Sequence, residues 1–393
     1  MKILYLWDSD YPWDVRVEKI CVTLVKNGND VHLAARNLKK LPEYENSDGF
    51  HIHRLKSFKN DKLNYALSFP AFFSPVWKHF LDKIIHKHKI ELIIVRDLPL
   101  AIAAIWAGKR LGIPVILDMA EDYLAMIRDI WRTRKFSGLN LLVRNPYLTR
   151  LVEQYVFKRI DHILVVIEEA IGVVQRGGGD PSKVSVVSNT PSLEIFDGSV
   201  GEMSNDLKII KERFSAIYAG GIQLGRGLQT VLDAIPETIR SIPDFLFVVV
   251  GDGYATGYLH KVIAKNKLQD YVFWVGWVDH GRIFDYIRAS KIGLIPHFVS
   301  AHVNTTIPNK IFDYMALGLP VVASDAVPLK RILNEEQCGV TFKSGDAEDF
   351  SRAVVSVHNS HIDYSKNGIN AVRKKYNWAE DEKRLFEVIR KFS

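Results

Sequence analysis

Cysteine is scarce in this chain, and long apolar runs are absent. Only Cys21 and Cys338 occur among 393 residues, too far apart in sequence to indicate a disulfide framework or a cysteine metal site. So few thiols are typical of a reducing compartment. No apolar run reaches the roughly 18 residues of a membrane span, so we expect no transmembrane helix. The opening MKILYLWD is too short an apolar run for a signal peptide, and we expect a cytoplasmic protein.

Glycine is missing where a dinucleotide-binding loop would need it. The turn after the first apolar stretch reads WDSDYPWD (residues 7–14), and GDG at 251–253 lacks a third glycine at the required spacing. Both observations argue against the GxGxxG loop of a dehydrogenase. DSD at 8–10 is the only literal match to a D-x-D metal motif, and we interpret it as a loop. We therefore expect no metal and no bound cofactor.

Short apolar runs that alternate with helical patterns fill most of the sequence. This alternation predicts βαβ units and an α/β fold with doubly wound parallel sheets. It lapses near residues 197–210 (DGSVGEMSNDLKII) and then restarts. A chain of 393 residues is long enough for two domains of about 180 residues each. Because ligands bind beyond the carboxyl ends of such strands, two domains would face a central cleft.

Positive charge is concentrated rather than spread. Residues 128–159 contain eight Lys or Arg and two acids, in a chain whose net charge is +7. The segment is either a solvated helix face or a patch for an anionic surface, such as lipid headgroups or a phosphorylated substrate. The uncharged aromatic stretch 63–77 precedes a basic helix, as in an interfacial anchor; the alternative is a loop and helix packed on the core. We expect an anionic membrane surface as a partner, and no nucleic acid.

A glycine-rich loop at 218–235 (YAGGIQLGRGLQTVLDAI) joins an apolar strand to a helix. Glycine permits close backbone approach to a ligand, and the N–H groups at a helix start attract anions. Arg226 stands at this entrance, and Lys310 at the start of a later helix. The two cations predict a diphosphate clamp, with a flexible connection and one surface arginine as the alternative.

Several stretches, in this order, resemble the family 4 glycosyltransferases. The C-terminal half contains YAGGIQLGRGL, VVVGDGY, VFWVGWV, IGLIPH and IPNKIFDYMALGLPVVASD. The N-terminal half adds DYPWDVRVEKICVTLVKNGNDVHL, VRDLPLAIAA, PVILDMAEDY and VSVVSNTP. The resemblance implies the GT-B fold, with two Rossmann-like domains. We expect an acceptor-side domain at 1–195, onto which the C-terminal helix 376–393 crosses back, and a nucleotide-sugar domain at 196–375.

The resemblance also implies roles for residues of the second half. Arg226 matches the basic residue that contacts the donor diphosphate, and Asp313 matches an acid that holds the ribose hydroxyls. Lys310 follows Asn309 in a variant form of the same motif. The remaining donor-side positions are expected near the nucleotide: Gly221, Gly225, Gly251, Gly253, Trp277 and Thr305.

Three positions depart from the family pattern. Gly221 stands where the family often has a second diphosphate cation, Thr305 where it has an acid that touches the sugar, and Ala120 where it has a histidine near the sugar. Our hypothesis is that Lys310 replaces the missing cation. The departures leave the donor sugar open.

Polar residues at strand ends in the first half predict the acceptor side. Asp14 and Arg16 lie in the first strand-to-helix turn, and Asp118 and Glu121 end a later strand. These side chains either cap and solvate loop ends or contact sugar hydroxyls, with one carboxylate, for which we take Glu121, as a base for the acceptor hydroxyl. Arg226, Lys310 and Glu121 are thus the expected catalytic residues.

The leading interpretation is a retaining glycosyltransferase of hexosyl or N-acetylhexosaminyl type. It would move a sugar from a nucleoside diphosphate, UDP as first choice, to a lipid-linked or saccharide acceptor in polysaccharide or glycolipid biosynthesis. It would be peripheral on the inner face of the membrane. The alternatives are a nucleotide-sugar 2-epimerase of the same fold, and a non-catalytic relative that binds nucleotide sugars or anions.

Overall fold

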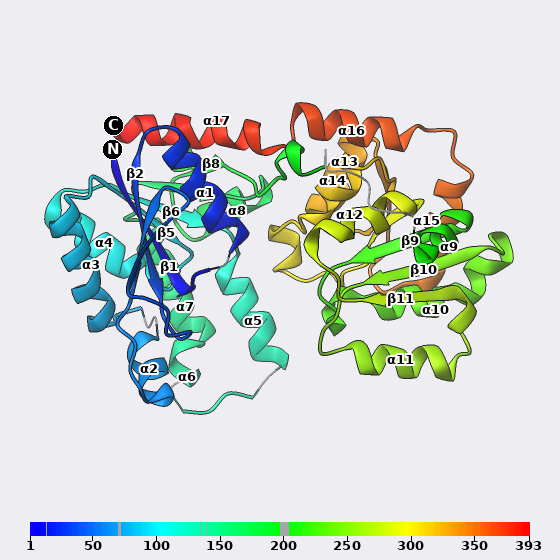
Figure 1. Ribbon diagram of the computed structural model, residues 1–393, viewed down its shortest axis with the longest axis horizontal. Helices are drawn as coiled ribbons and strands as arrows, with labels where there is room; N and C mark the ends of the chain where they lie inside the picture. The colour runs from blue at the N-terminus through cyan, green and yellow to red at the C-terminus, as the bar shows by residue number, and fades with distance from the viewer. Residues whose placement is uncertain (13, 70–71, 134, 139, 197–203) are drawn as a thin grey trace. The chain divides into compact units, whose positions relative to one another are not determined.

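The computed structural model describes residues 1–12, 14–69, 72–133, 135–138, 140–196 and 204–393. Two compact units make up the chain (Figure 1). Unit 1 is Met1–Asn189 with Glu382–Ser393, and unit 2 is Thr190–Asp381. Unit 1 therefore ends a few residues before the expected boundary at 195. Parts of the predicted linker, the aromatic stretch and the basic segment lie outside the described residues (197–203, 70–71, 134 and 139).

Unit 1 is built on an eight-stranded sheet in the order β3-β4-β2-β1-β5-β6-β7-β8. All neighbouring strands are parallel except the β3–β4 pair at one edge. The chain starts with β1 in the middle of the sheet and adds β2, β4 and β3 on one side of it. It then returns to β5, and β6, β7 and β8 follow on the other side. The strands are β1 (Lys2–Asp10), β2 (Asp30–Arg36), β3 (Tyr44–Ser47), β4 (Phe50–Arg54), β5 (Leu92–Arg96), β6 (Val115–Met119), β7 (His162–Val165) and β8 (Val184–Val186).

Short polar side chains start several helices of unit 1. Asp14 accepts hydrogen bonds from two N–H groups of α1, and Asn145 does the same for α7, where Pro146 follows at the first helical position. Ser74 caps α3, which buries Trp77 completely. The helices are α1 (Val15–Lys26), α2 (Asp61–Ser68), α3 (Pro75–His88), α4 (Ala101–Leu111), α5 (Tyr123–Thr133), α6 (Asn140–Val143), α7 (Pro146–Phe157) and α8 (Glu169–Arg176).

Unit 2 has a six-stranded, wholly parallel sheet in the order β11-β10-β9-β12-β13-β14. Its central strands are continuous apolar runs because helices cover both faces; β10 (FLFVVV) is fully buried. The predicted doubly wound α/β sheets are thus present in both units. The strands are β9 (Phe214–Ala219), β10 (Phe245–Val250), β11 (Val272–Gly276), β12 (Ile292–Ile295), β13 (Val321–Ser324) and β14 (Gly339–Phe342).

The helix predicted after Pro308 is α13, and it ends where glycine and proline follow it. Its apolar residues Ile311, Phe312 and Met315 are buried. Among the described residues, no helix has the length and apolar character needed to cross a membrane. The helices of unit 2 are α9 (Asn205–Glu212), α10 (Leu228–Ser241), α11 (Thr256–Lys265), α12 (His280–Ala289), α13 (Lys310–Ala316), α14 (Val327–Glu336), α15 (Ala347–His358) and α16 (Tyr364–Lys374), with α17 (Trp378–Ile389) passing from unit 2 into unit 1.

Candidate functional site

The sheet of unit 2 changes direction between β9 and β12, and the glycine-rich loop lies at this point. Ligands of doubly wound sheets bind beyond the carboxyl ends of the strands at such a switch. Gly227, which precedes α10, has a φ of +71°, and a Cβ atom there would lie 1.8 Å from the carbonyl oxygen of Pro296. Only glycine therefore lets the start of α10 approach the end of β12 this closely.

The two predicted glycine turns pack directly against each other. The Gly220 N–H donates to the Val250 carbonyl at 2.9 Å, and the Gly251 N–H donates to the Gly276 carbonyl at 2.7 Å. A Cβ atom at Gly251 would lie 2.1 Å from the Gly220 oxygen, and one at Gly253 would lie 2.2 Å from the Ile222 oxygen. The backbones are in contact, so these glycines shape the loop.

Gly221 and Gly225 lie in the same loop but differ from the packed glycines. No heavy atom lies within 4 Å of a Cβ atom built at either residue. Both positions are exposed. The open space beside them leaves room for a ligand against the loop backbone.

Lys310 reaches back from α13 onto this loop. Its Nζ atom lies 3.7 Å from the centre of the Tyr218 ring and 3.0 Å from where a Cβ atom of Gly220 would be. Burial, and then the charge of Arg226, hold the pKa of the Lys310 amine well below its usual value, whereas Asp313 acts in the opposite direction. The amine therefore reaches the loop in surroundings that disfavour its charged form.

His297, two residues after β12, completes this cluster and was not predicted. Its Nδ1 lies 3.4 Å from Nη1 of Arg226, and its ring is 2% exposed. Burial, followed by the charges of Lys310 and Arg226, lowers the pKa of His297 well below 6.5, so the ring is neutral. Its Nε2 is buried and has no hydrogen-bond partner among the described residues. The motif IGLIPH contained the residue, but spacing alone did not connect it with Arg226 and Lys310.

The other predicted donor-side residues take different positions. Trp277 follows Gly276 and is 74% exposed, and Asn309 is exposed at the start of α13. Asp313 is half-buried one turn after Lys310. The hydroxyl of Thr305 donates to the carbonyls of its own short helical turn, Ala301 and His302, both at 3.1 Å. Thr305 thus stabilises the turn that precedes α13.

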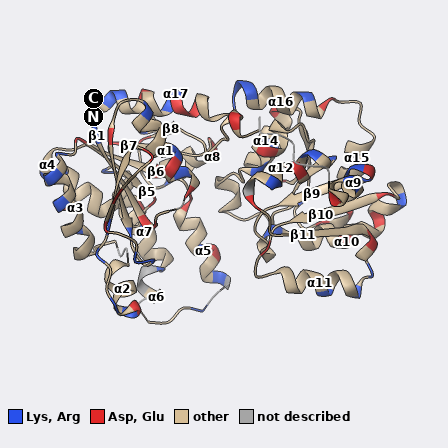
Figure 2. Cartoon of the chain, viewed as in Figure 1, with Lys and Arg blue, Asp and Glu red and all other residues tan. Residues whose placement is uncertain are grey.

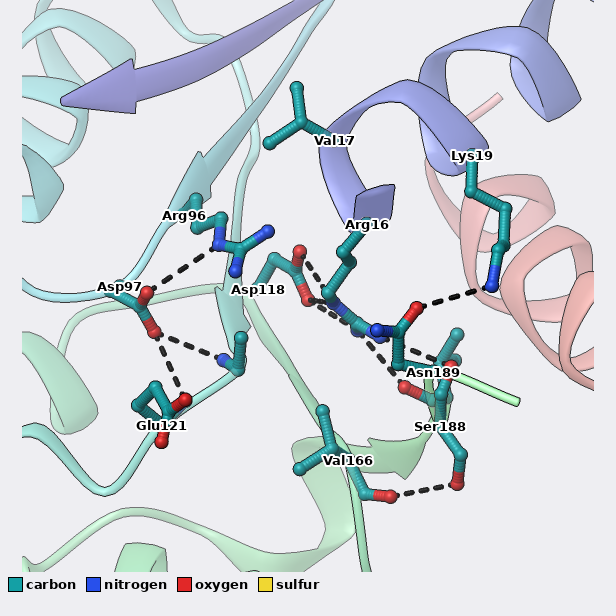
Figure 3. A network of polar contacts seen from close by, with 12 residues as sticks. Arg16, Val17, Lys19, Arg96, Asp97, Asp118, Glu121, Val166, Ser188 and Asn189 are labelled. Atoms are coloured by element: carbon teal, nitrogen blue, oxygen red, sulfur yellow. Dashed lines mark hydrogen bonds and ion pairs between the residues drawn. The ribbon is translucent and has the colours of Figure 1, made fainter. Parts of the chain in front are cut away.

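In unit 1, Arg16 and Asp118 form a buried ion pair (Figure 3). Nη2 of Arg16 lies 2.5 Å from Oδ1 of Asp118, and the side chains are 2% and 0% exposed. Arg16 also donates to the carbonyls of Val187 and Ser188, and Tyr5 donates its hydroxyl to Asp118 at 2.5 Å. Although burial opposes it, the guanidinium holds the pKa of Asp118 below its usual value. Both groups are engaged with each other in the interior, where α1, β1, β6 and the residues after β8 bring their partners together, and their acceptor-side role stays a prediction.

Asp14 and Glu121 lie around a second arginine, Arg96. Nη1 of Arg96 lies 2.6 Å from Oδ1 of Asp14, which also caps α1. Asp97, at a φ of +56°, accepts hydrogen bonds from the N–H groups of Ala120 (3.0 Å) and Glu121 (3.2 Å) (Figure 3). Burial raises the pKa of Asp97 to about 7, with Arg96 opposing and Glu121 adding to the rise. Asp97 was not predicted, and it holds the loop that carries Glu121.

A pocket of about 270 Å³ opens in unit 1 beside Asp8 and Ser9, near the carboxyl end of β1. Burial raises the pKa of Asp8 to about 6, while Arg36 and Arg96 lower it. Cations, aromatic rings and aliphatic groups all line this pocket. Its other lining residues are Arg36, Tyr65, Phe69, Phe72, Pro99, Tyr123, Met126, Ile127, Ile130 and Arg144.

Two family descriptions match the chain, one in each half. Residues 14–190 match the glycosyl transferase 4-like domain, and residues 213–360 match the glycosyl transferases group 1. The matched ranges contain the motifs on which the resemblance was based, except for residues 10–13 and Pro191. The chain belongs to the family 4 glycosyltransferases.

Curated relatives are distant in sequence. An uncharacterised glycosyltransferase of Methanocaldococcus jannaschii is 18% identical, over 91% of this chain and 90% of its own length. The D-inositol 3-phosphate glycosyltransferase 2 of Catenulispora acidiphila is 25% identical over 54% of this chain, and the match covers 51% of that protein. The lipopolysaccharide core biosynthesis glycosyltransferase LpsE of Rhizobium meliloti is 25% identical over 34% of this chain and 36% of its own length. The chain thus matches about half the length of the D-inositol 3-phosphate glycosyltransferase and about a third of the length of LpsE.

Solved structures confirm the predicted GT-B fold. Sucrose-phosphate synthase of Thermosynechococcus elongatus has a TM-score of 0.77 at 18% identity, over 99% of this chain and 98% of that protein. Anabaena HepE in complex with UDP has a TM-score of 0.71 at 15% identity, over all of both chains. At this level of identity the similarity concerns the fold.

Proposed function

We propose that this glycosyltransferase takes its sugar from a UDP-sugar and transfers it, with retention, to a lipid-linked or saccharide acceptor in polysaccharide or glycolipid assembly. The observation that carries the proposal is the cluster of Arg226, His297 and Lys310 at the switch point of unit 2. Arg226 disfavours the charged form of Lys310, and a bound anion would stabilise the charge on both residues. The UDP-bound structure of HepE, which has a similar fold, supports a uridine nucleotide.

In this proposal the leaving diphosphate is stabilised electrostatically. The bond between the anomeric carbon and the diphosphate oxygen breaks while the acceptor oxygen bonds to the same carbon. Arg226 and Lys310 offset the charge that develops on the diphosphate, which takes up the proton of the acceptor hydroxyl. Asp313, half-buried one turn from Lys310, holds the ribose hydroxyls, and the open backbone at Gly221 and Gly225 receives the phosphates. The proposed transfer requires no metal.

The acceptor side of the proposal uses unit 1. The pocket beside Asp8 combines the cations Arg36 and Arg144 with an aromatic wall, which suits an acceptor that joins an anionic group to apolar or sugar rings. Glu121, held by Asp97, and Asp14 are the acceptor-side carboxylates that we retain. Arg16 and Asp118 become positioning residues, because they fasten α1 to β6.

An anionic membrane surface remains our proposal for where the acceptor is met. Tyr147 and Leu151, one turn apart on α7, are 81% and 62% exposed. Tyr147 lines a recess of about 310 Å³ together with Arg128, Arg132 and Arg150. Figure 2 shows further Lys and Arg on α3 and α4. Exposed aromatic and aliphatic groups next to cations suit the headgroup layer of a bilayer.

A thermal-shift panel of UDP, GDP, ADP and their sugars tests the donor, because a ligand that binds only the folded state raises the melting temperature. We expect the largest shift for the uridine compounds. Labelled sugar that passes to an added acceptor identifies a transferase, whereas conversion of the free nucleotide sugar to its 2-epimer identifies the alternative enzyme. Binding without turnover of any sugar nucleotide would contradict a catalytic role.

A further inference from the structure

Four histidines gather in unit 1 on one face of the neighbouring strands β2 and β4. His32 lies on β2, opposite His51 of β4, and His53 follows two residues later on the same face. His88, the last residue of α3, packs over them: its ring centre is 4.3 Å from that of His32 and 5.0 Å from that of His53. The rings of His32 and His53 are 5.2 Å apart.

The nitrogen atoms of three of these rings converge. One ring nitrogen each from His32, His53 and His88 lie within 4.8 Å of one another. Nδ1 of His32 and Nε2 of His53 lie 3.0 Å apart. Nε2 of His88 is buried and has no hydrogen-bond partner within the described part of the chain. Tetrahedral bonds of about 2.0–2.1 Å from a metal to imidazole correspond to nitrogen separations of about 3.3 Å. Small ring rotations would bring the trio to that spacing.

Asp30 stands behind His32 in the way that outer carboxylates support metal-binding histidines. Its Oδ1 lies 3.3 Å from Nε2 of His32, and the side chain of His32 is 1% exposed. Nε2 of His32 makes no hydrogen bond within the described part of the chain, but a carboxylate on this side favours the tautomer that carries its proton there. In that tautomer the lone pair is on Nδ1, which lies 3.0 Å from Nε2 of His53.

Two of the three rings are buried in the interior of unit 1: His32 is 1% exposed and His53 is 8% exposed. Packing alone would be served better by aliphatic side chains, which bring no buried polar nitrogen.

We propose that His32, His53 and His88 form a Zn²⁺ site, with Asp30 as the supporting carboxylate. Three imidazoles favour zinc or a similar transition ion over Mg²⁺ or Ca²⁺, which prefer oxygen ligands. The site ties the end of α3 to β2 and β4. His32 pairs with Leu4 of β1, whereas the pocket beside Asp8 lies four residues further along β1, so the role of the site is structural.

This inference differs from the sequence-based expectation of no metal. That expectation concerned cysteine patterns and D-x-D motifs. The three histidines come from two strands and a helix that are distant in sequence, so no local spacing indicates them. The proposed glycosyl transfer uses no metal, and the two proposals stand or fall independently.

Calorimetric titration of the full chain, purified without a histidine tag and stripped with a chelator, tests the site. We expect one Zn²⁺ per chain, and Co²⁺ to give the intense visible bands of a tetrahedral site. His53→Ala and His88→Ala should each lower the Zn²⁺ affinity at least about 100-fold, and Asp30→Asn about 10–100-fold. His86→Ala is the matched control, since His86 is exposed on the same helix and should leave binding unchanged.

Melting temperature provides a readout that does not depend on catalysis. Zn²⁺ should raise the melting temperature of the wild type and of His86→Ala, but not that of His53→Ala. Circular dichroism of the metal-free variants verifies that they fold. Absence of stoichiometric Zn²⁺ binding by the wild type, or wild-type affinity in both His53→Ala and His88→Ala, would overturn the proposal and leave the cluster as packing only.

Discussion

The side-chain amine of Lys310, on α13, lies 3.7 Å from the centre of the Tyr218 ring on β9. This relationship joins two elements of unit 2 whose ends meet at the switch point of the sheet. It also brings the amine close to the backbone of Gly220. Arg226 lies in the same loop, at the end of the short helical turn that precedes α10. The first predictions follow from this placement.

Lys310→Met keeps an apolar stem against Tyr218 and removes the charge. We expect it to lower kcat/KM at least about 100-fold, as the loss of one electrostatic contact to a transition state does. Arg226→Met should have a comparable effect. Lys265→Met, at an exposed position of α11, serves as control. Unchanged turnover in Lys310→Met, together with lost turnover in Arg226→Met, would show that Lys310 does not replace the missing cation.

UDP binding should take up a proton. Burial and Arg226 lower the pKa of Lys310 in the ligand-free protein, and a bound diphosphate would raise it again. Affinity for UDP should therefore fall as pH rises through the lowered pKa. Calorimetry in buffers of different ionisation enthalpy measures the proton uptake, which Lys310→Met should abolish. Equal uptake in the variant would assign the proton to another group.

The same shift predicts how stability depends on pH. Between the lowered pKa of Lys310 and 10.5, the unfolded chain binds more protons than the folded one at this residue. The contribution of Lys310 to the free energy of unfolding therefore becomes more favourable as pH rises through this window. Urea unfolding of the wild type and of Lys310→Met at several pH values measures this contribution. The difference between their free energies of unfolding should become smaller at high pH.

Gly227→Ala should disturb the switch point. The added methyl group would meet the Pro296 carbonyl at 1.8 Å, in a backbone conformation that disfavours side chains. We expect a loss of about 1–3 kcal/mol of unfolding free energy, together with weaker UDP binding. Gly257→Ala is the control, because that helical position is open and alanine there should be neutral or stabilising by about 0.5–1 kcal/mol.

Arg16→Ala should destabilise the chain by about 3–5 kcal/mol, because it leaves the Asp118 carboxylate buried without its main partner. The double variant with Asp118→Ala should lose less than the sum of the single losses, which denaturant unfolding can measure. Arg240→Ala, from an exposed pair with Glu237, should have no measurable effect. Additive losses at Arg16 and Asp118 would argue against the coupling.

Flotation with anionic liposomes tests the membrane proposal. We expect salt-sensitive binding that decreases in the double variant Tyr147→Ser and Leu151→Ser, since both side chains are exposed on α7 and Tyr147 lies beside the cations of the α5–α7 recess. Tyr258→Ser, on α11 of unit 2, is the matched control. Equal flotation of all three proteins, or none in the wild type, would exclude this surface.

Much of the fold was readable from local pattern. Continuous apolar runs such as FLFVVV formed buried parallel strands, and the helix expected after Pro308 starts at Lys310. Helix caps such as Asp14 of α1 are short polar residues that come directly before an apolar pattern with helical spacing. The motif spacings led to the family, which the comparisons bear out. Site roles for Arg226, Lys310 and Asp313 remain predictions.

The sequence by itself determined the alternation of strands and helices, because periodicity and capping depend on neighbours a few residues apart. Only the tertiary structure decided which polar groups share an environment. From the sequence, Arg16 and Asp118 could either cap and solvate loop ends or contact sugar hydroxyls, and the order of the strands made them a buried pair. His32, His53 and His88 became one cluster in the same way. The cost of burying a polar group depends on the partners that other elements supply, and residue spacing along the chain does not contain that information.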